Sequence, residues 1–130
     1  GPSQRKMALL ILEILSEATP LAAELPMPHD ERLNRATKEL LVSHRWEASL
    51  SDLAHIANMS ERTFSRMFIK DTGFSFRTWK QRARICASLD LLANGISIKQ
   101  VSYQLGFSCP AAFTAAFRSI LELTPRNFLL

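Results

Sequence analysis

The sequence predicts an all-α fold in which two similar pairs of short helices are joined by a longer helix. Apolar residues recur at spacings of three and four over most of the 130 residues, and serine or aspartate precedes several of these runs. Hydrophobic residues make up 47% of the chain against 22% charged, with only four glycines, which is typical of a packed protein. A pattern of short helix, turn and second helix also occurs twice.

The first 29 residues differ from the rest. Residues 1–4 look like a leftover of protease cleavage, and fold reasoning excludes them. Residues 5–29 comprise a helix to about Ala18 that is apolar on most sides, then a proline-rich linker. This helix either packs on the rest of the chain or is the remnant of a missing upstream domain or dimer seam, and the second interpretation is favoured. Its apolar run is too short to cross a bilayer, so we expect a cytoplasmic protein without membrane contact.

A folded domain is predicted over residues 30–130. Asp30 lies at an N-cap position, before an amphipathic helix that extends to about His44. The first pair of short helices covers about 51–72, with Ser51 and Ser60 as the caps of its two helices. Gly73 follows, at a position that favours a left-handed C-cap.

The connector and the second pair complete the domain. The long connector helix is predicted over about 75–94, with Ser75 as its cap and Asn94–Gly95 as its stop. The second pair covers about 97–121, where Ser97 and Gln100 form a capping box and Gly106 breaks the first helix. A helix with Phe113, Phe117 and Ile120 on its buried side then runs from Pro110 to Leu121, and Thr124–Pro125 begin a final turn.

The two helix pairs align with each other, and the second has one extra residue in its turn. LAHIANMSERTFSRMF (residues 53–68) matches VSYQLGFSCPAAFTAAF (residues 101–117), so that Phe64 corresponds to Phe113 and Phe68 to Phe117. Each copy buries the inner face of its second helix against its first helix and leaves the opposite face free to enter a DNA groove. The sequence therefore predicts two helix-turn-helix motifs.

The outward faces of the two second helices are the candidate base-reading surfaces. The first presents arginines and a serine, residue types that bond to guanine or reach a phosphate: Arg62, Ser65 and Arg66. The second presents small residues that offer methyl contacts to thymine and one hydroxyl: Pro110, Ala111, Thr114 and Ala115. We expect the first motif to dominate affinity and the second to read shape, methyl groups or register.

Positive charge is concentrated between the two motifs. The net charge is only +4, but residues 60–84 carry seven bases and two acids. Such a block indicates a phosphate-facing surface, or else an ordinary solvated helix face. The residues predicted to contact phosphates are Ser51, Ser75, Lys80, Arg82, Ser97 and Arg118.

Other classes of function find little support. Cys86 and Cys109 form no CxxC pair, and no histidine completes a zinc site, so both cysteines are expected to be small apolar fillers, with redox sensing by Cys109 as the alternative. No metal or cofactor is expected. The chain has no glycine-rich phosphate loop, clustered carboxylate pair or nucleophile triad, so we expect no enzyme. A helical protein–protein interaction module is the rival to DNA binding.

A family resemblance accompanies these motifs. GFSCPAAFTAAFRSILELTPRNF (residues 106–128) resembles the C-terminal signature of the AraC/XylS family of transcription regulators, and MFIKDTGFSFRTWKQRARI (residues 67–85) is similar to that family too. The resemblance spans about residues 30–128. It implies a homeodomain-like fold of seven helices in two helix-turn-helix subdomains joined by one long helix. Its recognition helices correspond to Glu61–Lys70 and Pro110–Ile120.

The resemblance also carries functional implications. It implies sequence-specific binding of double-stranded DNA as a transcription regulator, with two recognition helices in successive major-groove segments. RNA polymerase and a homodimer formed through the missing upstream domain are the further partners that it implies. The sequence departs from the family at Glu122, where glycine is usual, and at Leu121, where the residue is often aromatic. We therefore expect unusual geometry after the second recognition helix.

Overall fold

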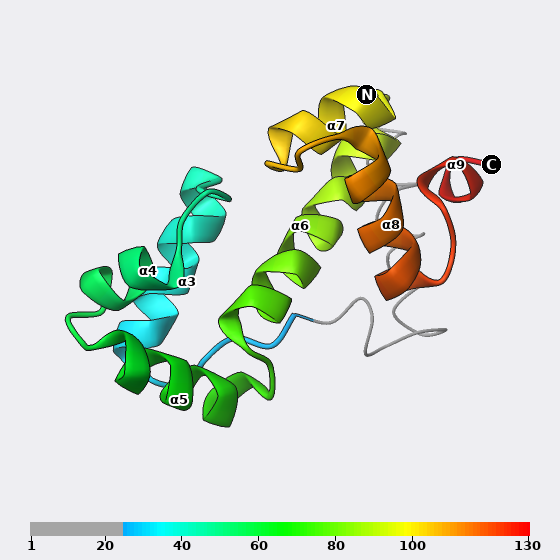
Figure 1. Ribbon diagram of the computed structural model, residues 1–130. Coiled ribbons are helices and arrows are strands. Elements are labelled where there is room, and N and C mark those ends of the chain that lie inside the picture. Colours follow the sequence, from blue (N-terminus) through cyan, green and yellow to red (C-terminus); the bar gives the residue numbers. More distant parts are fainter. Residues whose placement is uncertain (1–24) are drawn as a thin grey trace. The chain divides into compact units, whose positions relative to one another are not determined.

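The computed structural model describes residues 25–130, and over this range it consists of seven α-helices and no strand. The all-α prediction is therefore confirmed, whereas the helix predicted over residues 5–18 lies outside the described residues. The described chain divides into two compact units, which end and begin at Gln81 and Arg82. We call residues 25–81 the N-terminal unit and residues 82–130 the C-terminal unit. The long helix α6 (Phe76–Ala93) passes from one to the other (Figure 1).

The N-terminal unit contains α3 (Glu31–Ser43), α4 (Leu50–Ile56), α5 (Glu61–Thr72) and the start of α6. Helix α3 packs on α4, and α4 packs on α5. The predicted cap at Asp30 is confirmed, since its carboxylate accepts hydrogen bonds from the backbone of Arg32 and Leu33. Helix α5 begins after the cap Ser60 and ends at Gly73, whose φ of 82° is the predicted left-handed conformation.

The cap of α4 is not the predicted residue. Ser49 is the N-cap, and it forms a capping box in which its hydroxyl accepts from the Asp52 backbone while the Asp52 carboxylate accepts from the Ser49 backbone. Ser51 is the second residue of the helix, so the predicted cap at Ser51 is wrong. The two serines are two residues apart, and only Ser49 has an acidic residue at the third position beyond it, as a capping box requires.

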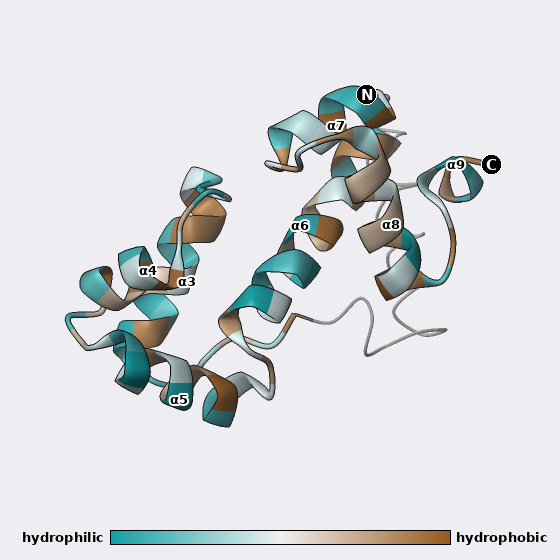
Figure 2. Ribbon diagram, viewed as in Figure 1, coloured by the Kyte–Doolittle hydropathy of each residue, from teal (hydrophilic) through white to brown (hydrophobic). Residues whose placement is uncertain are grey.

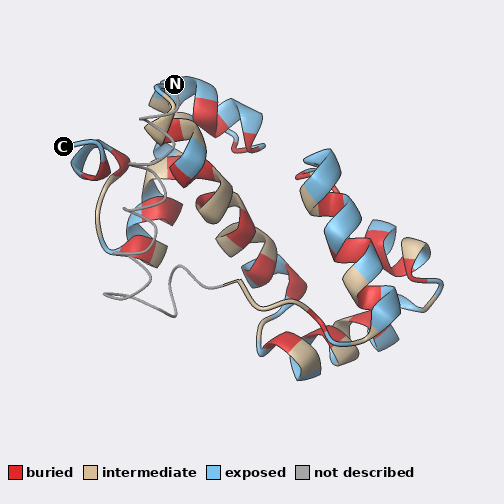
Figure 3. Ribbon diagram, turned by 180° about the vertical axis from the view of Figure 1, so that it is seen from behind, coloured by how far each residue is buried: buried red, intermediate tan, exposed pale blue. Residues whose placement is uncertain are grey.

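Four aromatic rings cluster in the core of the N-terminal unit. Phe64 and Phe68 on α5 stack with ring centroids 5.7 Å apart, and Phe68 meets Phe76 and Trp79 of α6 edge-on at 5.8 and 5.6 Å. Phe64, Phe68 and Trp79 are all fully buried. The helices accordingly show buried residues on one side and exposed residues on the other (Figure 3). The predicted inner face of the first helix-turn-helix is confirmed.

The C-terminal unit repeats this arrangement. The rest of α6 leads to α7 (Ile98–Gln104), α8 (Pro110–Leu121) and the short α9 (Pro125–Phe128), and α8 packs on both α7 and α9. The hydroxyl of Ser97 accepts from the backbone N–H of Gln100, so the predicted cap of α7 is confirmed. The hydroxyl of Thr124 caps the short helix α9, where the sequence predicted the beginning of a final turn. Helix α8 has the predicted bounds, with Pro110 at its first position, where a missing N–H costs nothing.

A second aromatic cluster fills this unit. Phe113 lies 5.4 Å from Phe107 and 5.8 Å from Phe117, measured between ring centroids, and Phe117 lies 6.0 Å from Phe128. Phe113 and Phe117 are fully buried, as predicted. Ile120 is only half-buried, and the adjacent Leu121 takes the core position assigned to it.

Helix α8 ends in a strained conformation. Glu122 has a φ of 63° and a ψ of 18°, which is the left-handed region, and its backbone N–H bonds to the carbonyl of Arg118. Glycine adopts this conformation without steric cost, whereas a residue with a Cβ does not. The departure from the family pattern at Glu122 therefore falls on the one residue of this turn where a glycine would be favoured.

Candidate nucleic-acid interface

The outer face of α5 carries the predicted arginines. Because Phe64 and Phe68 point into the core, Arg62 and Arg66 lie on the opposite side of the helix, and both are exposed. Ser65 is half-buried and lies at the boundary between the two faces. The two guanidinium groups are one turn apart and therefore side by side along the helix, which suits contacts to neighbouring base pairs.

Two further residues extend this face toward the end of α5. Ile69 is 48% exposed, and Lys70 is exposed in the last turn. Neither was predicted as a contact residue. The sequence spacing could have predicted them, because Ile69 follows Arg66 by three residues and Lys70 follows it by four. These spacings place all three residues on one face of a helix.

The outer face of α8 is made of small side chains. Ala111 and Ala115 are exposed, and Thr114 and Pro110 are half-buried. An open groove of about 660 Å³ follows this face, and its lining residues are Ala111, Thr114, Ala115, Arg118, Ser119 and Thr124. The structure thus brings three predicted base-contacting residues together with the predicted phosphate contact Arg118. Figure 2 shows the contrast with α5, whose exposed turns are more hydrophilic than the alanine-rich turns of α8.

A second groove lies within the N-terminal unit. It has a volume of about 260 Å³ and brings the predicted Ser65, Ser75 and Lys80 together. Its other lining residues are Ser49, Leu50, Phe76 and Arg77. The groove therefore joins the outer edge of α5 to the starts of α4 and α6, where backbone N–H groups point outward. An exposed arginine, Arg77, adds positive charge to it.

Lys80 is held more firmly than a surface lysine. Its ammonium group donates to the carbonyl of Ala48 at 3.1 Å and lies 5.7 Å from the centre of the Phe76 ring. The sequence predicted Lys80 as a phosphate contact and did not predict these two contacts within the protein. These two contacts orient the ammonium group of Lys80 within the groove, where its positive charge favours an anion.

The remaining predicted phosphate contacts do not share one site. Ser51 is exposed inside α4 and does not line the groove formed by its neighbour Ser49. Ser97 caps α7 with its hydroxyl, which accepts from the backbone of Gln100. Arg82 is half-buried on α6, whereas Arg118 is exposed on α8. Ser75 and Lys80 line the groove that contains Ser65, and Arg118 lines the groove that contains Ala111, Thr114 and Ala115.

Arg84 has a role that the sequence reasoning missed. Its guanidinium lies 4.4 Å from the centre of the Phe107 ring and donates to the carbonyl of Gly106 at 3.3 Å. Burial lowers the pKa of this guanidinium from its usual value. Arg84 thus ties α6 to the turn between α7 and α8.

The two cysteines differ from each other. Cys86 is half-buried, and burial raises the pKa of its thiol, which agrees with a filler role. Cys109 is exposed at the N-cap of α8, so the prediction that it is an apolar filler is wrong. The backbone N–H of Ala112, more than the side chain of Ser108, lowers the pKa of the Cys109 thiol.

Within residues 25–130, no three histidine, cysteine, aspartate or glutamate side chains gather closely enough to hold a metal ion. No helix in this range combines the length and apolar character needed to span a membrane.

Known families and proteins resemble this chain. The family model described as "Helix-turn-helix domain" matches residues 53–130. The HTH-type transcriptional regulator RipA of Corynebacterium glutamicum is 39% identical over 105 residues, which are 80% of this chain and 31% of RipA. NimR of Escherichia coli, also an HTH-type transcriptional regulator, is 27% identical over 129 residues, covering 98% of this chain and 47% of NimR. The chain thus spans less than half the length of both regulators.

Solved structures show the same fold. The DNA-binding domain of AdpA, a global transcriptional factor crystallised with a target DNA, superposes with a TM-score of 0.71 and 28% identity, covering 77% of this chain and 91% of that one. The C-terminal domain of AraT, a response regulator of Geobacillus stearothermophilus, gives a TM-score of 0.70 at 20% identity, with 77% and 84% coverage. The AraT likeness concerns the fold alone.

Proposed function

Because the chain belongs to the AraC-type helix-turn-helix family of transcription regulators, we propose that it binds double-stranded DNA sequence-specifically through α5 and α8. One observation carries the proposal: each of these helices has a buried aromatic inner face and an exposed outer face, and on α5 the outer face presents Arg62 and Arg66. Exposed arginines on a helix that follows a tight turn suit the edges of guanine in the major groove.

The two helices would read DNA in different ways. Arg62 and Arg66 offer charged, bidentate hydrogen bonds, each worth about 1–3 kcal/mol of discrimination between bases. The methyl groups of Ala111 and Ala115 offer contacts to thymine, and their small size lets the backbone of α8 lie close to the floor of the groove. We therefore assign most of the base discrimination to α5 and a weaker, shape-dependent contribution to α8 in the next groove segment.

Phosphate contacts would set the register of the first motif. The groove that contains Ser65, Ser75 and Lys80 adjoins the outer edge of α5, and its lysine is already oriented by Ala48 and Phe76. A phosphate held there would fix α5 along the duplex without carrying sequence information itself. Arg118 would act in the same way beside α8. Ser51, Arg82 and Ser97 stay predictions as phosphate contacts.

Further partners follow from regulation of transcription. RNA polymerase, and a second copy joined through an upstream domain, stay predictions. The expected location is the cytoplasm, at the nucleoid.

Selection of bound sites from random duplex DNA, followed by titration of the selected site, tests the proposal. Affinity should fall steeply with salt, because phosphate contacts release counterions, whereas a protein-interaction module has no such counterions to release. Failure to enrich any sequence, or an affinity independent of salt, would contradict DNA binding.

Variants of the α5 face sharpen this test. Arg66→Ala should lower affinity for the selected site by about 5-fold to 150-fold and relax the preference at one base pair. Arg35→Ala is the matched control, since Arg35 is an exposed arginine of the same unit, on α3. Equal losses in the two variants would show that Arg66 supplies only charge and would remove its base-reading assignment.

A further inference from the structure

The segment before α3 is bound to the N-terminal unit along its length. We call residues 25–30 the strap. The carbonyl of Pro26 accepts a 2.7 Å hydrogen bond from the indole N–H of Trp79, and the carbonyl of Pro28 accepts one of 3.1 Å from the side chain of Asn34. A proline has no backbone N–H, so its carbonyl is the only backbone group that needs a partner. The part of the proline-rich linker that the structure describes is therefore docked.

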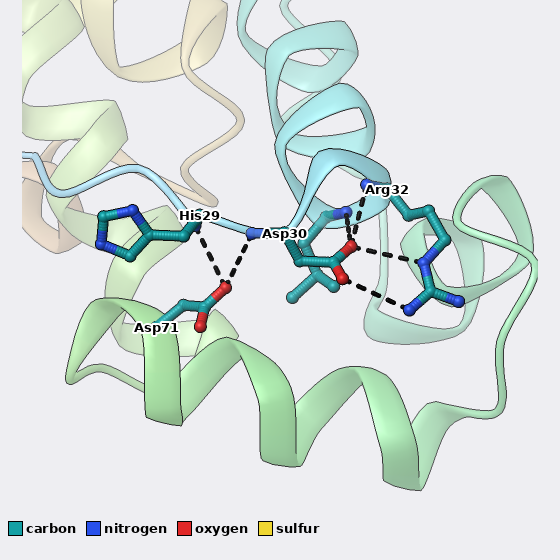
Figure 4. Close-up of polar contacts among 5 residues, drawn as sticks. His29, Asp30, Arg32 and Asp71 are labelled. Carbon is teal, nitrogen blue, oxygen red and sulfur yellow. Dashed lines mark hydrogen bonds and ion pairs between the residues drawn. The ribbon is translucent and has the colours of Figure 1, made fainter.

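Asp71 makes the connection to α5. Its Oδ2 atom accepts two backbone hydrogen bonds from the strap, from His29 at 3.1 Å and from Asp30 at 3.0 Å (Figure 4). Asp71 lies in the last turn of α5, where the helix dipole disfavours a negative charge. The carboxylate of Asp71 thus stabilises the contact with the strap and not the helix α5 on which it lies.

The strap therefore joins two helix ends. Asp30 is the N-cap of α3, so the bonds from Asp71 hold the start of α3 and the end of α5 against each other. The same α5 presents Arg66 about one and a half turns before Asp71 and Arg62 about two and a half turns before it. A displacement of the strap would consequently act on the helix that carries the base-reading arginines.

We infer that the strap couples the chain preceding residue 25 to the DNA-reading face of α5 through Asp71. The docked strap holds α5 in its DNA-binding position, and release of the strap lowers DNA affinity without unfolding the unit. This inference rests on the proposed function and adds a route by which that function is regulated. Because coupling of two equilibria is reciprocal, DNA bound to α5 must in turn favour the docked strap.

Charge-matched variants of the 130-residue protein provide the first test. Asp71→Ala removes the acceptor, Asp71→Asn keeps an oxygen that can accept, and Asp90→Ala removes the same charge from an exposed position on α6. We expect affinity for the selected duplex to fall about fivefold or more in Asp71→Ala, less in Asp71→Asn and not at all in Asp90→Ala. Loss of a negative charge alone would tighten binding to a polyanion, so the expected change has the opposite sign to the electrostatic effect.

Hydrogen exchange of the unmodified protein provides the second test and does not depend on how a variant folds. The backbone amides of His29 and Asp30 should exchange slowly, and the selected duplex should slow them further, by about the factor that separates Asp71→Ala from wild type in affinity. The strap inference is overturned if Asp71→Ala binds as tightly as wild type, or if DNA leaves exchange at His29 and Asp30 unchanged. Absence of DNA binding by the wild-type protein overturns the proposed function instead.

Discussion

Replacing Phe64 with alanine should unfold the N-terminal unit or leave it close to its midpoint of unfolding. Phe64 is fully buried, and its ring lies 5.7 Å from Phe68 and 6.3 Å from Phe76, measured between centroids. Truncation of a buried phenylalanine costs about 3–5 kcal/mol through lost transfer energy and the cavity that it leaves. A unit that extends from Leu25 to Gln81 is expected to have a total stability of roughly 3–9 kcal/mol, at 0.05–0.15 kcal/mol per residue.

The chain provides its own probe for this measurement. Both of its tryptophans, Trp46 and Trp79, are buried in the N-terminal unit, and Trp79 packs edge-on against Phe68. Tryptophan fluorescence in a urea titration therefore follows this unit, whereas far-UV circular dichroism follows the helices of both. The Phe64→Ala variant should lose the fluorescence transition or shift it to low urea, and it should keep part of its helical signal from the C-terminal unit.

A control in the same helix decides the interpretation. Ile69 is also a large apolar residue of α5, but it is 48% exposed, so Ile69→Ala should change stability by about 0.5 kcal/mol or less. If Phe64→Ala shifted the fluorescence transition no further than Ile69→Ala, the inner face of α5 would not carry the fold. The assignment of its opposite face to DNA would then lose its structural basis.

Four further predictions concern the helix ends and the second motif. Glu122→Gly should stabilise the C-terminal unit by about 0.5–1 kcal/mol by relieving a left-handed backbone, and thermal unfolding that shows no gain would contradict this. Ser49→Ala should lower the free energy of unfolding of the N-terminal unit by about 1 kcal/mol, and Ser51→Ala should lower it by less than about 0.5 kcal/mol, as measured by tryptophan fluorescence. Equal losses in the two variants would argue against the observed capping box. Arg84→Met keeps an apolar contact with the Phe107 ring but loses the hydrogen bond to the Gly106 carbonyl. The free energy of unfolding of the C-terminal unit should fall by about 1–2 kcal/mol, and the affinity for DNA should fall as well. An affinity equal to that of the wild-type protein would rule out a positioning role for Arg84. The backbone N–H of Ser49 holds the pKa of the Asp52 carboxyl below its usual value of 3.8. The stability that the ionised carboxylate adds to the folded state is present above about pH 4 and is lost as the pH falls through the lowered pKa. The free energy of unfolding of Asp52→Asn should therefore depend less on pH in that range, and an unchanged dependence would refute the assignment.

Local signals in the sequence predicted most of the fold. The repeat of two phenylalanines four residues apart gave the inner faces of α5 and α8, because helical periodicity alone determines which residues share a face. The caps Ser60 and Ser97 and the bounds of α8 also follow from short-range chemistry. The misplaced cap, Ser51, has no acidic residue three positions on, whereas the observed cap Ser49 has Asp52 at that position.

Contacts between distant residues could not be predicted in the same way. Lys80 binds a carbonyl 32 residues away, and Arg84 binds one 22 residues away, so neither contact leaves a pattern within a helical window. The strap bonds of Asp71 span 41 and 42 residues. The exposure of Cys109 likewise depends on the turn that precedes α8, whereas composition favours burial for cysteine. The sequence thus predicted the faces of the helices, but not the polar contacts that fix their positions.

The alanine-rich outer face of α8 has a consequence for how such a protein can change its target. Phe113 and Phe117 supply the packing of this helix, while Ala111 and Ala115 are exposed and contribute no volume to the core. Larger or polar side chains at these two positions would alter the chemistry offered to a base pair at little expense to folding. New operator preferences are therefore accessible by single substitutions on α8, and a small library varied at residues 111 and 115 would sample them.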